Sequence, residues 1–416
     1  MSDSDPFGSR PFVIVGAGQA GRWLALTLRE QGYSGRIVWC GDEAHRPYER
    51  PPLSKAALKG DLALAQIALL DDARFAALDL DWRPGTPITA IDRAAQCVHT
   101  ASGERLPYAR LFLALGGRPR TLPGVAPHPR LCLLRTWDDA QALKARLASA
   151  RRVLVLGGGW IGLEVAASAR RLGLQVTLLE AAPRLCARTM PPVVSSHLQA
   201  LHLAEGVHLR LGTAVAQVAA DDAGVQVTLA DGERLDADLL VIGIGLLPND
   251  ALASAAGLAT GNGVFTDAQG RTADPAVFAV GDVANTLQAD GSRLRLESWD
   301  NAQRQAVAAA RAALGLAPDP AADTPPWFWS DQYDDNLQVL GQPLARHAVV
   351  QRDEPARRAR MIFFCDGATV RAVAAVNAGR DLRIVRKWMA QGRFPTLQAL
   401  AEAGTDLNRL PLHAPA

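Results

Sequence analysis

Cysteine is scarce in this sequence, and the cysteines present are not arranged for redox or metal chemistry. The 416 residues include five cysteines, and no two of them form a C-x-x-C pair. An odd number of isolated cysteines argues against a disulfide framework or a zinc ribbon and favours a reducing cytoplasm. A dithiol relay is therefore not available beside the glycine motifs described below. The five are Cys40, Cys97, Cys132, Cys186 and Cys365.

Further absences narrow the class of protein. The eight histidines show no H-E-x-x-H and no paired spacing, so no metal site is expected. The longest apolar run, residues 239–247, contains two glycines and is far shorter than the ~20 residues of a membrane span. Residues 1–10 lack the apolar region of a secretory signal. The net charge of +2 does not indicate binding to nucleic acid or to an anionic membrane. Together with the isolated cysteines, the lack of a signal predicts a cytoplasmic protein.

Residues 153–180 carry a dinucleotide motif. An apolar run leads into Gly157-Gly158-Gly159-Trp160-Ile161-Gly162, then a helix of small residues and a second apolar run that ends at Glu180. Gly157 permits a tight turn, Gly159 lets a pyrophosphate approach the backbone, and Gly162 lets the helix pack closely on the strand. The helix N-terminus offers free N–H groups to phosphates. Glu180 would bind a ribose diol and repel a 2′-phosphate, which favours NADH over NADPH.

A second copy of this motif lies near the N-terminus. The apolar run 12–15 leads into Gly16-Ala17-Gly18-Gln19-Ala20-Gly21, and Asp42 follows the next strand, where the ribose-binding acid belongs. Two complete units predict two nucleotides. Because the first unit stands at the extreme N-terminus, FAD is its natural occupant, and a nicotinamide dinucleotide is expected on the second.

The two halves also resemble each other beyond the motifs. A Ser-Gly turn signal at 102–103 precedes the apolar run 111–115, and an Asp-Gly signal at 231–232 precedes the run 239–244. Both predict a hairpin between short strands. The interpretation is a duplicated module, one per nucleotide, and the alternative is chance similarity of two hairpins.

Three other segments allow a functional or a structural interpretation. Residues 48–55 hold two prolines before Ser54 and Lys55, and alone they indicate a rigid loop with an ordinary surface lysine. The run 277–284 is a short strand with Asp282 after it, which would bind a ribityl hydroxyl or only cap a turn. After residues 325–326, an aromatic cluster, short strands and a helix over 381–391 predict an α+β domain.

Together these segments resemble the FAD-dependent, NADH-oxidising ferredoxin reductases that serve bacterial Rieske dioxygenases and cytochrome P450s. The most specific pieces are residues 50–55, 157–164, 279–282, 297–299 and 326–332. The resemblance implies an α/β, glutathione-reductase-like fold with two Rossmann-type dinucleotide-binding domains and an α+β C-terminal domain. The implied boundaries are 1–115 and 246–325 for a split FAD domain, 116–245 for the NADH domain and 326–416 for the C-terminal domain.

The resemblance also implies two sets of cofactor-binding residues and two catalytic residues, Lys55 and Glu164, paired beside the flavin. The FAD set, with the glycines of the first motif, is Gly16, Gly18, Ala20, Gly21, Asp42, Arg50, Lys55, Ile88, Arg135, Asp282 and Trp299. The NADH set is Gly157, Gly159, Ile161, Gly162, Glu164, Glu180 and Gly245.

The implied activity is that of an FAD-dependent ferredoxin–NAD(+) reductase. A hydride passes from NADH to FAD, and electrons leave singly to a [2Fe–2S] ferredoxin that feeds a P450 or Rieske-type oxygenase. Lys55 should stabilise negative charge on the flavin, and Glu164 should bind the nicotinamide carboxamide. Either a monomer or a homodimer fits. Basic residues should dock the ferredoxin, with candidates Arg304, Arg311, Arg383, Arg386 and Lys387.

Two other functions remain open at this point. An NADH oxidase or disulfide reductase of the same fold would need a redox cysteine, and Cys40, the nearest candidate, is expected to be buried at the end of a strand. A flavin-bearing interaction protein resembling apoptosis-inducing factor is disfavoured by the short C-terminal domain and by the lack of a targeting sequence.

Overall fold

The structure, a computed structural model, describes residues 9–319 and 324–414. Its contacts divide the chain into two compact units. Of the described residues, unit 1 contains 9–49, 63–118 and 246–319, and unit 2 contains 50–62, 119–245 and 324–414. Within the described residues, no helix is both long enough and apolar enough to cross a membrane.

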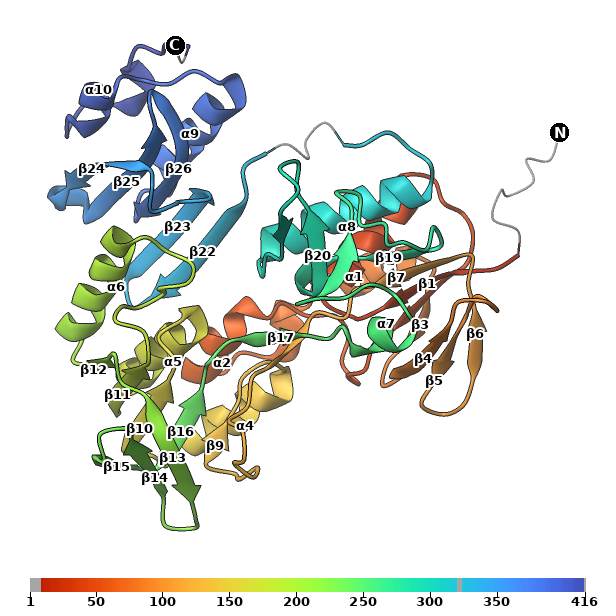
Figure 1. The fold of residues 1–416 in the computed structure, drawn as a ribbon, viewed down its shortest axis with the longest axis horizontal. Coiled ribbons are helices and arrows are strands. Elements are labelled where there is room, and N and C mark those ends of the chain that lie inside the picture. Colours follow the sequence, from red (N-terminus) through yellow and green to blue (C-terminus); the bar gives the residue numbers. More distant parts are fainter. Residues whose placement is uncertain (1–8, 320–323, 415–416) are drawn as a thin grey trace. The chain divides into compact units, whose positions relative to one another are not determined.

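A five-stranded parallel sheet of order β19-β7-β1-β2-β3 forms the centre of unit 1 (Figure 1). Helices α1 (Gln19–Glu30) and α8 (Trp299–Ala313) pack against each other and against this sheet through one apolar cluster. Every residue of β1 and β2 is buried, as expected for strands covered on both faces. The strands are β1 (Phe12–Val15), β2 (Ile37–Cys40), β3 (Asp81–Arg83), β7 (Arg110–Leu113) and β19 (Val277–Ala279).

An antiparallel three-stranded sheet lies on the other side of unit 1. Its strands β4 (Ile88–Asp92), β5 (Cys97–Thr100) and β6 (Arg105–Pro107) include the turn predicted at 102–103. Val98 and Leu106 pack there in one cluster with Val13 and Leu111 of the parallel sheet. The remaining elements are η2 (Leu64–Ile67), α3 (Asp72–Ala77), β8 (Gly117–Pro119), β17 (Leu246–Pro248), α7 (Ala251–Ala255), β18 (Val264–Thr266), η3 (Gly281–Val283), β20 (Ala284–Leu287) and β21 (Arg293–Leu294).

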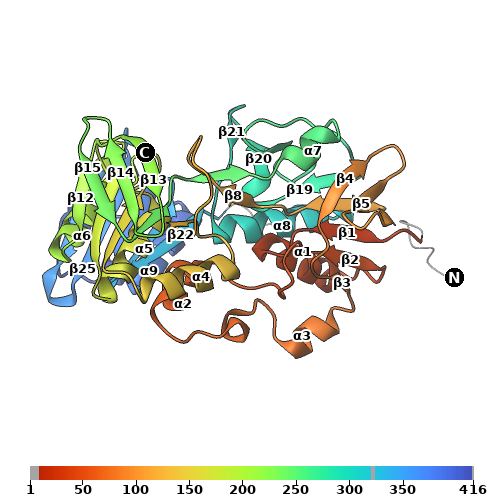
Figure 2. The same ribbon diagram turned by 90° about the horizontal axis from the view of Figure 1, so that it is seen from below.

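Unit 2 repeats this plan. A parallel sheet of order β12-β11-β10-β16-β9 is accompanied by the antiparallel sheet β13-β14-β15, whose turn lies at the predicted 231–232 (Figure 2). The duplicated module expected from the hairpin signals is therefore present in the fold. Its elements are β9 (Leu131–Cys132), α4 (Trp137–Leu147), β10 (Arg152–Leu156), α5 (Trp160–Arg171), β11 (Gln175–Glu180), α6 (Pro192–Ala204), β12 (His208–Leu211), β13 (Val215–Ala220), β14 (Val225–Leu229), β15 (Arg234–Ala237) and β16 (Leu239–Ile242).

The C-terminal part of unit 2 is the α+β region that the sequence predicts. An antiparallel sheet of order β22-β23-β26-β25-β24 packs against α9 (Gly379–Gln391). The segment 50–62, far away in sequence, also belongs to unit 2 and forms η1 (Pro51–Ser54) and α2 (Ala56–Lys59). The other elements are β22 (Trp327–Gln332), β23 (Asp335–Gly341), β24 (Ala348–Glu354), η5 (Pro355–Arg357), β25 (Ala359–Asp366), β26 (Thr369–Val376), α10 (Leu397–Ala401) and η6 (Leu407–Arg409).

Candidate active site

The N-terminal glycine turn lies at the carboxyl end of the parallel sheet of unit 1. Gly16 has a φ of +115°, and a Cβ there would lie 2.1 Å from the carbonyl oxygen of Ala114, which follows β7. A Cβ on Gly21 would lie 2.2 Å from the carbonyl oxygen of Gly16. At Gly18 no atom of the described residues lies within 4 Å of an ideal Cβ. The turn therefore stands between β1 and β7, at the switch point where such sheets bind ligands, with its middle glycine uncovered.

Gln19 begins α1 directly after this turn, and the state of its side chain shows whether a polar ligand fits there. Both polar atoms of its side-chain amide are buried, and among the described residues neither has a hydrogen-bond partner. No side chain caps the N-terminus of the helix. An unpaired buried amide costs roughly 1–3 kcal/mol, which a polar ligand at the turn would offset. The turn thus suits the pyrophosphate of a dinucleotide.

Three of the predicted FAD residues belong to elements that meet beside this turn. Gly281 has a φ of +74°, and a Cβ there would lie 3.2 Å from Cβ of Ala20 and 3.7 Å from Cβ of Ala302. Asp282 follows it in η3, and Trp299 opens α8 one turn before Ala302. The starts of α1 and α8 and the turn after β19 are thus brought together.

The other predicted FAD residues are distributed between the units. Asp42 is exposed after β2, and its Oδ1 accepts a hydrogen bond from the next main-chain N–H at 3.1 Å. Ile88 is half-buried in β4 and packs on the cluster beneath the parallel sheet. Arg50, Lys55 and Arg135 belong to unit 2, where Nη1 of Arg50 donates to the carbonyl oxygen of Arg135 at 2.6 Å.

The second glycine turn has the same backbone geometry in unit 2. Gly157 has a φ of +108°, and a Cβ there would lie 2.3 Å from the carbonyl oxygen of Gly243, which follows β16. A Cβ on Gly162 would lie 2.0 Å from the carbonyl oxygen of Gly157, whereas Gly159 has no described atom within 4 Å. The outer glycines are required by packing, and the middle one leaves room for a ligand.

The other predicted NADH residues surround this second turn. Glu180 ends β11, and its carboxylate accepts hydrogen bonds from the N–H groups of Gly158 at 2.6 Å and Ala182 at 2.7 Å. Ile161 exposes 46% of its surface in the first turn of α5, which leaves an apolar side chain uncovered beside the glycines. Gly245 has a φ of +108° and accepts a hydrogen bond from the main chain of Arg120 at 2.9 Å.

Two arginines after Glu180 differ in their availability. Arg184 donates from Nη1 to Ser195 Oγ at 2.8 Å and from Nη2 to the carbonyl oxygen of Ala187 at 2.8 Å, so its own loop occupies it. Arg188 is exposed, and its Nη1 would lie 3.7 Å from a Cβ on Gly245. Only Arg188 of this pair is therefore placed to attract a 2′-phosphate.

Lys55 and Glu164, the predicted catalytic residues, form a buried ion pair in unit 2. Nζ of Lys55 lies 2.9 Å from Oε2 of Glu164, and the two side chains expose 15% and 4% of their surfaces. Ser54 Oγ donates to the same oxygen at 2.5 Å, and Ser330 Oγ donates to Oε1 at 2.6 Å. A buried charge needs such partners, because removing one of them leaves the other charge uncompensated.

Three serines that were not predicted as site residues complete this site, namely Ser54, Ser168 and Ser330. Ser168 Oγ donates to the carbonyl oxygen of Ser54 at 2.7 Å, which fastens η1 to α5. Lys55 Nζ also donates to the carbonyl oxygen of Pro51 at 3.1 Å. Ser54 and Ser330 both stand inside motifs singled out for the family resemblance, and a hydroxyl within such a motif was the available signal.

The cysteines are buried thiols. Burial raises the pKa of Cys40 to about 12 and that of Cys186 to about 12, and it raises the pKa of both Cys132 and Cys365 to about 11. Cys97 is also buried and unpaired by any disulfide. Cys40 is buried at the end of β2, as expected, and its raised pKa disfavours the thiolate, which is the reactive form of a cysteine.

One group of possible metal ligands lies apart from these sites. Side-chain atoms of Asp92, Cys97 and His99 lie within 4.8 Å of one another on the β4–β5 hairpin. Nη2 of Arg105 lies 3.5 Å from the sulfur of Cys97. This guanidinium opposes the binding of a second cation, and the sequence contains no motif for a metal site there.

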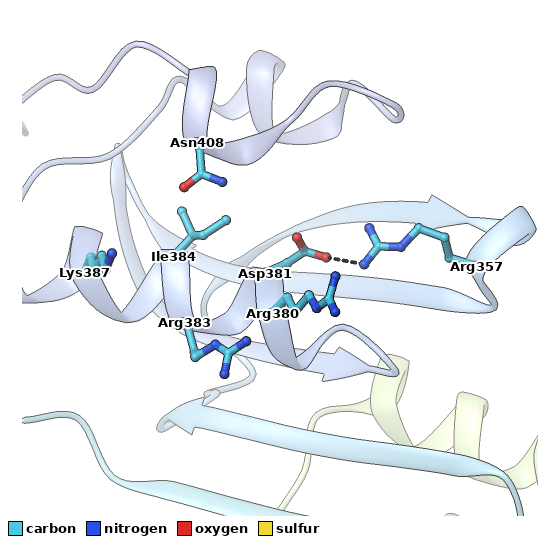
Figure 3. A pocket seen from close by; sticks show the side chains of 7 residues that line it. All are labelled: Arg357, Arg380, Asp381, Arg383, Ile384, Lys387 and Asn408. Atoms are coloured by element: carbon cyan, nitrogen blue, oxygen red, sulfur yellow. Dashed lines mark hydrogen bonds and ion pairs between the residues drawn. The ribbon is translucent and has the colours of Figure 1, made fainter.

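A basic cavity of about 510 Å³ opens beside α9 in the C-terminal part of unit 2 (Figure 3). Four cationic side chains line the cavity, and one of them, Arg357, is neutralised locally because its Nη2 pairs with Asp381 at 3.1 Å. Its lining residues are Arg357, Arg380, Asp381, Arg383, Ile384, Lys387 and Asn408. In unit 1, by contrast, Arg304 pairs with Asp300 at 3.1 Å, and Arg311 donates to Gln31 and to the main chain of Ala317.

Two family models match the chain. A model described as pyridine nucleotide-disulphide oxidoreductase matches residues 10–306, and one described as reductase C-terminal matches residues 327–411. The chain is 44% identical over 407 residues to the ferredoxin–NAD(+) reductase component of the anthranilate 1,2-dioxygenase system of Burkholderia cepacia. The match covers 96% of this chain and 98% of the relative.

Solved structures agree with these matches. The ferredoxin reductase of the CYP199A2 system from Rhodopseudomonas palustris superposes with a TM-score of 0.90 at 36% identity, covering 96% of this chain and 99% of that one. Putidaredoxin reductase in its covalent complex with putidaredoxin has a TM-score of 0.90 at 37% identity, covering 96% and 97%. This confirms the predicted fold class, and FAD and NADH are the cofactors of these proteins. The chain belongs to the ferredoxin–NAD(+) reductases of the pyridine nucleotide-disulphide oxidoreductase family.

Proposed function

We propose that this protein transfers a hydride from NADH to FAD and passes the electrons singly to a [2Fe–2S] ferredoxin in the cytoplasm. The ferredoxin would feed a cytochrome P450 or a Rieske-type oxygenase. The observation that carries the proposal is the pair of glycine turns whose outer glycines pack in the same way. The second turn opens α5, which bears Glu164, and the carboxylate of Glu164 pairs with Lys55. Family membership supports it, because relatives are named as reductases of such systems.

The FAD would be held mainly by unit 1. Gly18 and the uncapped start of α1 would receive the pyrophosphate, with the unpaired amide of Gln19 beside it. Asp42 would bind the ribose, and Asp282 a hydroxyl of the ribityl chain. We propose the domain limits 1–115 and 246–325 for FAD, 116–245 for NADH and 326–416 for the C-terminal domain.

The NADH would be held by unit 2. Gly159 and the start of α5 would receive its pyrophosphate, and Glu180 would exchange its two main-chain donors for the hydroxyls of a ribose. Ile161 offers an apolar surface next to the glycines. A carboxylate at this position disfavours a 2′-phosphate, so NADH is the proposed electron donor.

The catalytic work of the chain is orientation and electrostatics. FAD, when bound, accepts a hydride and releases electrons one at a time. The ammonium of Lys55 would stabilise the negative charge of the reduced flavin. Glu164 would accept a hydrogen bond from the carboxamide of NADH. Because both side chains are nearly buried, their charges act in a low dielectric, where they count for more than in water.

The ferredoxin would dock on basic side chains. Of the candidates named from the sequence, Arg383 and Lys387 line the cavity beside α9, whereas Arg304 and Arg311 are already bonded within unit 1. A cavity with four cations against one carboxylate suits an acidic protein. The relative captured with putidaredoxin is a precedent for such a partner. A monomer or a homodimer remains the proposed assembly.

The decisive experiment is NADH-driven reduction of a panel of [2Fe–2S] ferredoxins by the purified yellow protein. Rapid reduction of at least one ferredoxin, followed by reduction of cytochrome c, is the expected result. Flavin reduction by NADH without any ferredoxin reduction would overturn the proposal. Alkylation of accessible thiols should leave the activity intact, because the cysteines are buried, and loss of activity would instead favour a thiol-dependent oxidase.

A further inference from the structure

A line of hydrogen-bonded polar side chains begins at buried Glu164 and ends at half-buried Tyr333. Ser330 Oγ lies 2.6 Å from Glu164 Oε1, and Gln332 Nε2 lies 3.0 Å from Ser330 Oγ. Gln332 Oε1 lies 2.8 Å from His202 Nε2, and His202 Nδ1 lies 3.2 Å from the hydroxyl of Tyr333. The five residues come from α5, β22, α6 and the turn after β22, all within unit 2.

The contacts allow one direction of hydrogen bonding along this line. An ionised carboxylate only accepts, so Ser330 donates its proton to Glu164 and must accept from Gln332. The amide oxygen of Gln332 then faces His202, whose Nε2 must carry a proton. His202 Nδ1 is left as the acceptor for the hydroxyl of Tyr333. Every donor therefore points towards Glu164.

Burial makes these bonds obligatory. Ser330 and His202 are completely buried, and Gln332 exposes only 2% of its surface. Burial lowers the pKa of His202 to about 4, so the ring is neutral near neutral pH and has one N–H, as the line requires. A buried polar line that is only partly satisfied is worse than an apolar core, so each member holds its neighbour in place.

At its Glu164 end, the line meets the carboxylate that pairs with Lys55. Glu164 Oε1 is held by Ser330, and Oε2 faces Ser54 and Lys55. Both oxygens are therefore fixed, and the plane of the carboxylate is set by groups on two sides. The side-chain amide in the middle of the line also separates Ser330 from His202, and a primary amide does not pass protons stepwise as a hydroxyl or an imidazole does.

We propose that Gln332 and His202 are positioning residues that fix the Glu164 carboxylate, and through it the Lys55 ammonium, for hydride transfer, and that they do not relay protons. This rests on the proposed function, in which Lys55 and Glu164 act beside the FAD. The positioning comes from β22 and α6, so the C-terminal sheet contributes to the geometry of the NADH side.

The test is anaerobic stopped-flow reduction of the FAD-loaded protein by saturating NADH. Gln332→Met removes both bonds of Gln332 at similar volume, and the rate of flavin reduction should fall about tenfold, corresponding to one misplaced interaction in the transition state. The dissociation constant of NADH and the FAD content should stay near wild type. Gln338→Met is the matched control, since Gln338 lies in the neighbouring strand and bonds to Trp327 and Asn336 instead. A rate equal to that of the control would overturn the proposal.

Two substitutions of His202 separate positioning from proton relay. His202→Gln keeps a donor for Gln332 and an acceptor for Tyr333 and should retain a rate within about threefold of wild type, whereas His202→Leu should lose about as much as Gln332→Met. Equal losses in both variants would favour a relay and contradict positioning. This pair also decides the matter if Gln332→Met does not fold.

A measurement without turnover completes the test. Nitrogen-15 NMR of labelled histidine should show His202 neutral, protonated at Nε2 and unprotonated at Nδ1 near neutral pH, with the His202→Gln spectrum identifying its signals. A proton on Nδ1 or a charged ring would overturn the inferred direction. If NADH failed to reduce the wild-type flavin, the proposed function would be wrong. The NMR result would still test the inferred direction of hydrogen bonding from Tyr333 to Glu164.

Discussion

The two glycine turns share their backbone packing but differ in what surrounds them. Beside the first turn, the buried amide of Gln19 has no partner among the described residues, and Trp39 Nε1 donates to the carbonyl oxygen of Gly16 at 3.0 Å. Beside the second, Ile161 is exposed and Glu180 is already bonded to Gly158. The first turn has a buried amide without a hydrogen-bond partner among the described residues, and a permanently bound ligand would supply one. The carboxylate at the second turn already has hydrogen-bond partners within the protein, which suits a ligand that binds and dissociates.

This difference agrees with a retained FAD and an exchanging NADH. An unpaired buried amide costs stability that a bound nucleotide would offset, so the first nucleotide should contribute to the stability of the fold. Glu180 already has two main-chain hydrogen-bond partners, so the second nucleotide should contribute less. The following substitutions test this contrast, from the largest expected effect to the smallest.

The strongest test replaces the first glycine of each turn. Gly16→Ala and Gly157→Ala each place a Cβ within 2.3 Å of a carbonyl oxygen at a positive φ. Gly16→Ala should yield protein with little bound FAD, whereas Gly157→Ala should keep FAD and lose kcat/KM for NADH on the order of a hundredfold or more, because the backbone must move. Flavin content by absorbance and steady-state kinetics check both.

The control for backbone strain is Gly173→Ala. Gly173 has a φ of +84° but no described atom within 4 Å of a Cβ. Gly173→Ala should lower the free energy of unfolding by about 1–2 kcal/mol and leave both nucleotides bound. Loss of FAD from Gly157→Ala would contradict the separation of the two turns.

Glu164→Ala should slow flavin reduction by about a hundredfold while FAD is retained, because Lys55 would be left buried without its carboxylate. Stopped-flow reduction by NADH gives the rate, and released flavin gives the retention. Glu164→Gln keeps the shape and isolates the charge, and its rate should fall between those of wild type and Glu164→Ala. Equal rates in all three proteins would refute the role of this carboxylate.

Glu180→Ala should weaken discrimination between the two nicotinamide cofactors. Removal of the carboxylate leaves exposed Arg188 near Gly245, so kcat/KM for NADPH should rise about tenfold and that for NADH should fall modestly. Kinetics with both cofactors check this. The double variant Glu180→Ala with Arg188→Ala should not show the increased kcat/KM for NADPH. A higher kcat/KM for NADPH than for NADH in the wild-type protein would contradict the role of Glu180 as the selector for NADH.

The smallest effect is expected at the basic cavity. Arg383→Glu with Lys387→Glu should lower kcat/KM for ferredoxin by roughly three- to tenfold at low salt, and the difference should shrink as salt rises. Flavin reduction by NADH should not change. Arg271→Glu, on an exposed arginine of unit 1 paired with Asp267, is the matched control. Ferredoxin turnover without salt dependence would argue against this docking surface.

Local patterns predicted most of the fold. The two glycine turns and both hairpins were found at the expected residues, because steric limits at positive φ and turn chemistry act over a few residues. Element ends were less well predicted. The C-terminal helix, expected over 381–391, begins earlier, at Gly379, and β24 runs through polar residues to Glu354 because β25 pairs with it.

The sequence alone determined the two glycine turns at which nucleotides are predicted to bind, since each turn depends on its own glycines and the adjoining strands. Tertiary structure decided what stands beside them. Ser54 and Ser330 are separated from Glu164 by 110 and 166 residues, and the segment 50–62 packs within unit 2 rather than unit 1. The direction of hydrogen bonding from Tyr333 to Glu164 arises only when β22, α6 and α5 exclude water together, because burial is a property of the packed elements and not of any one of them.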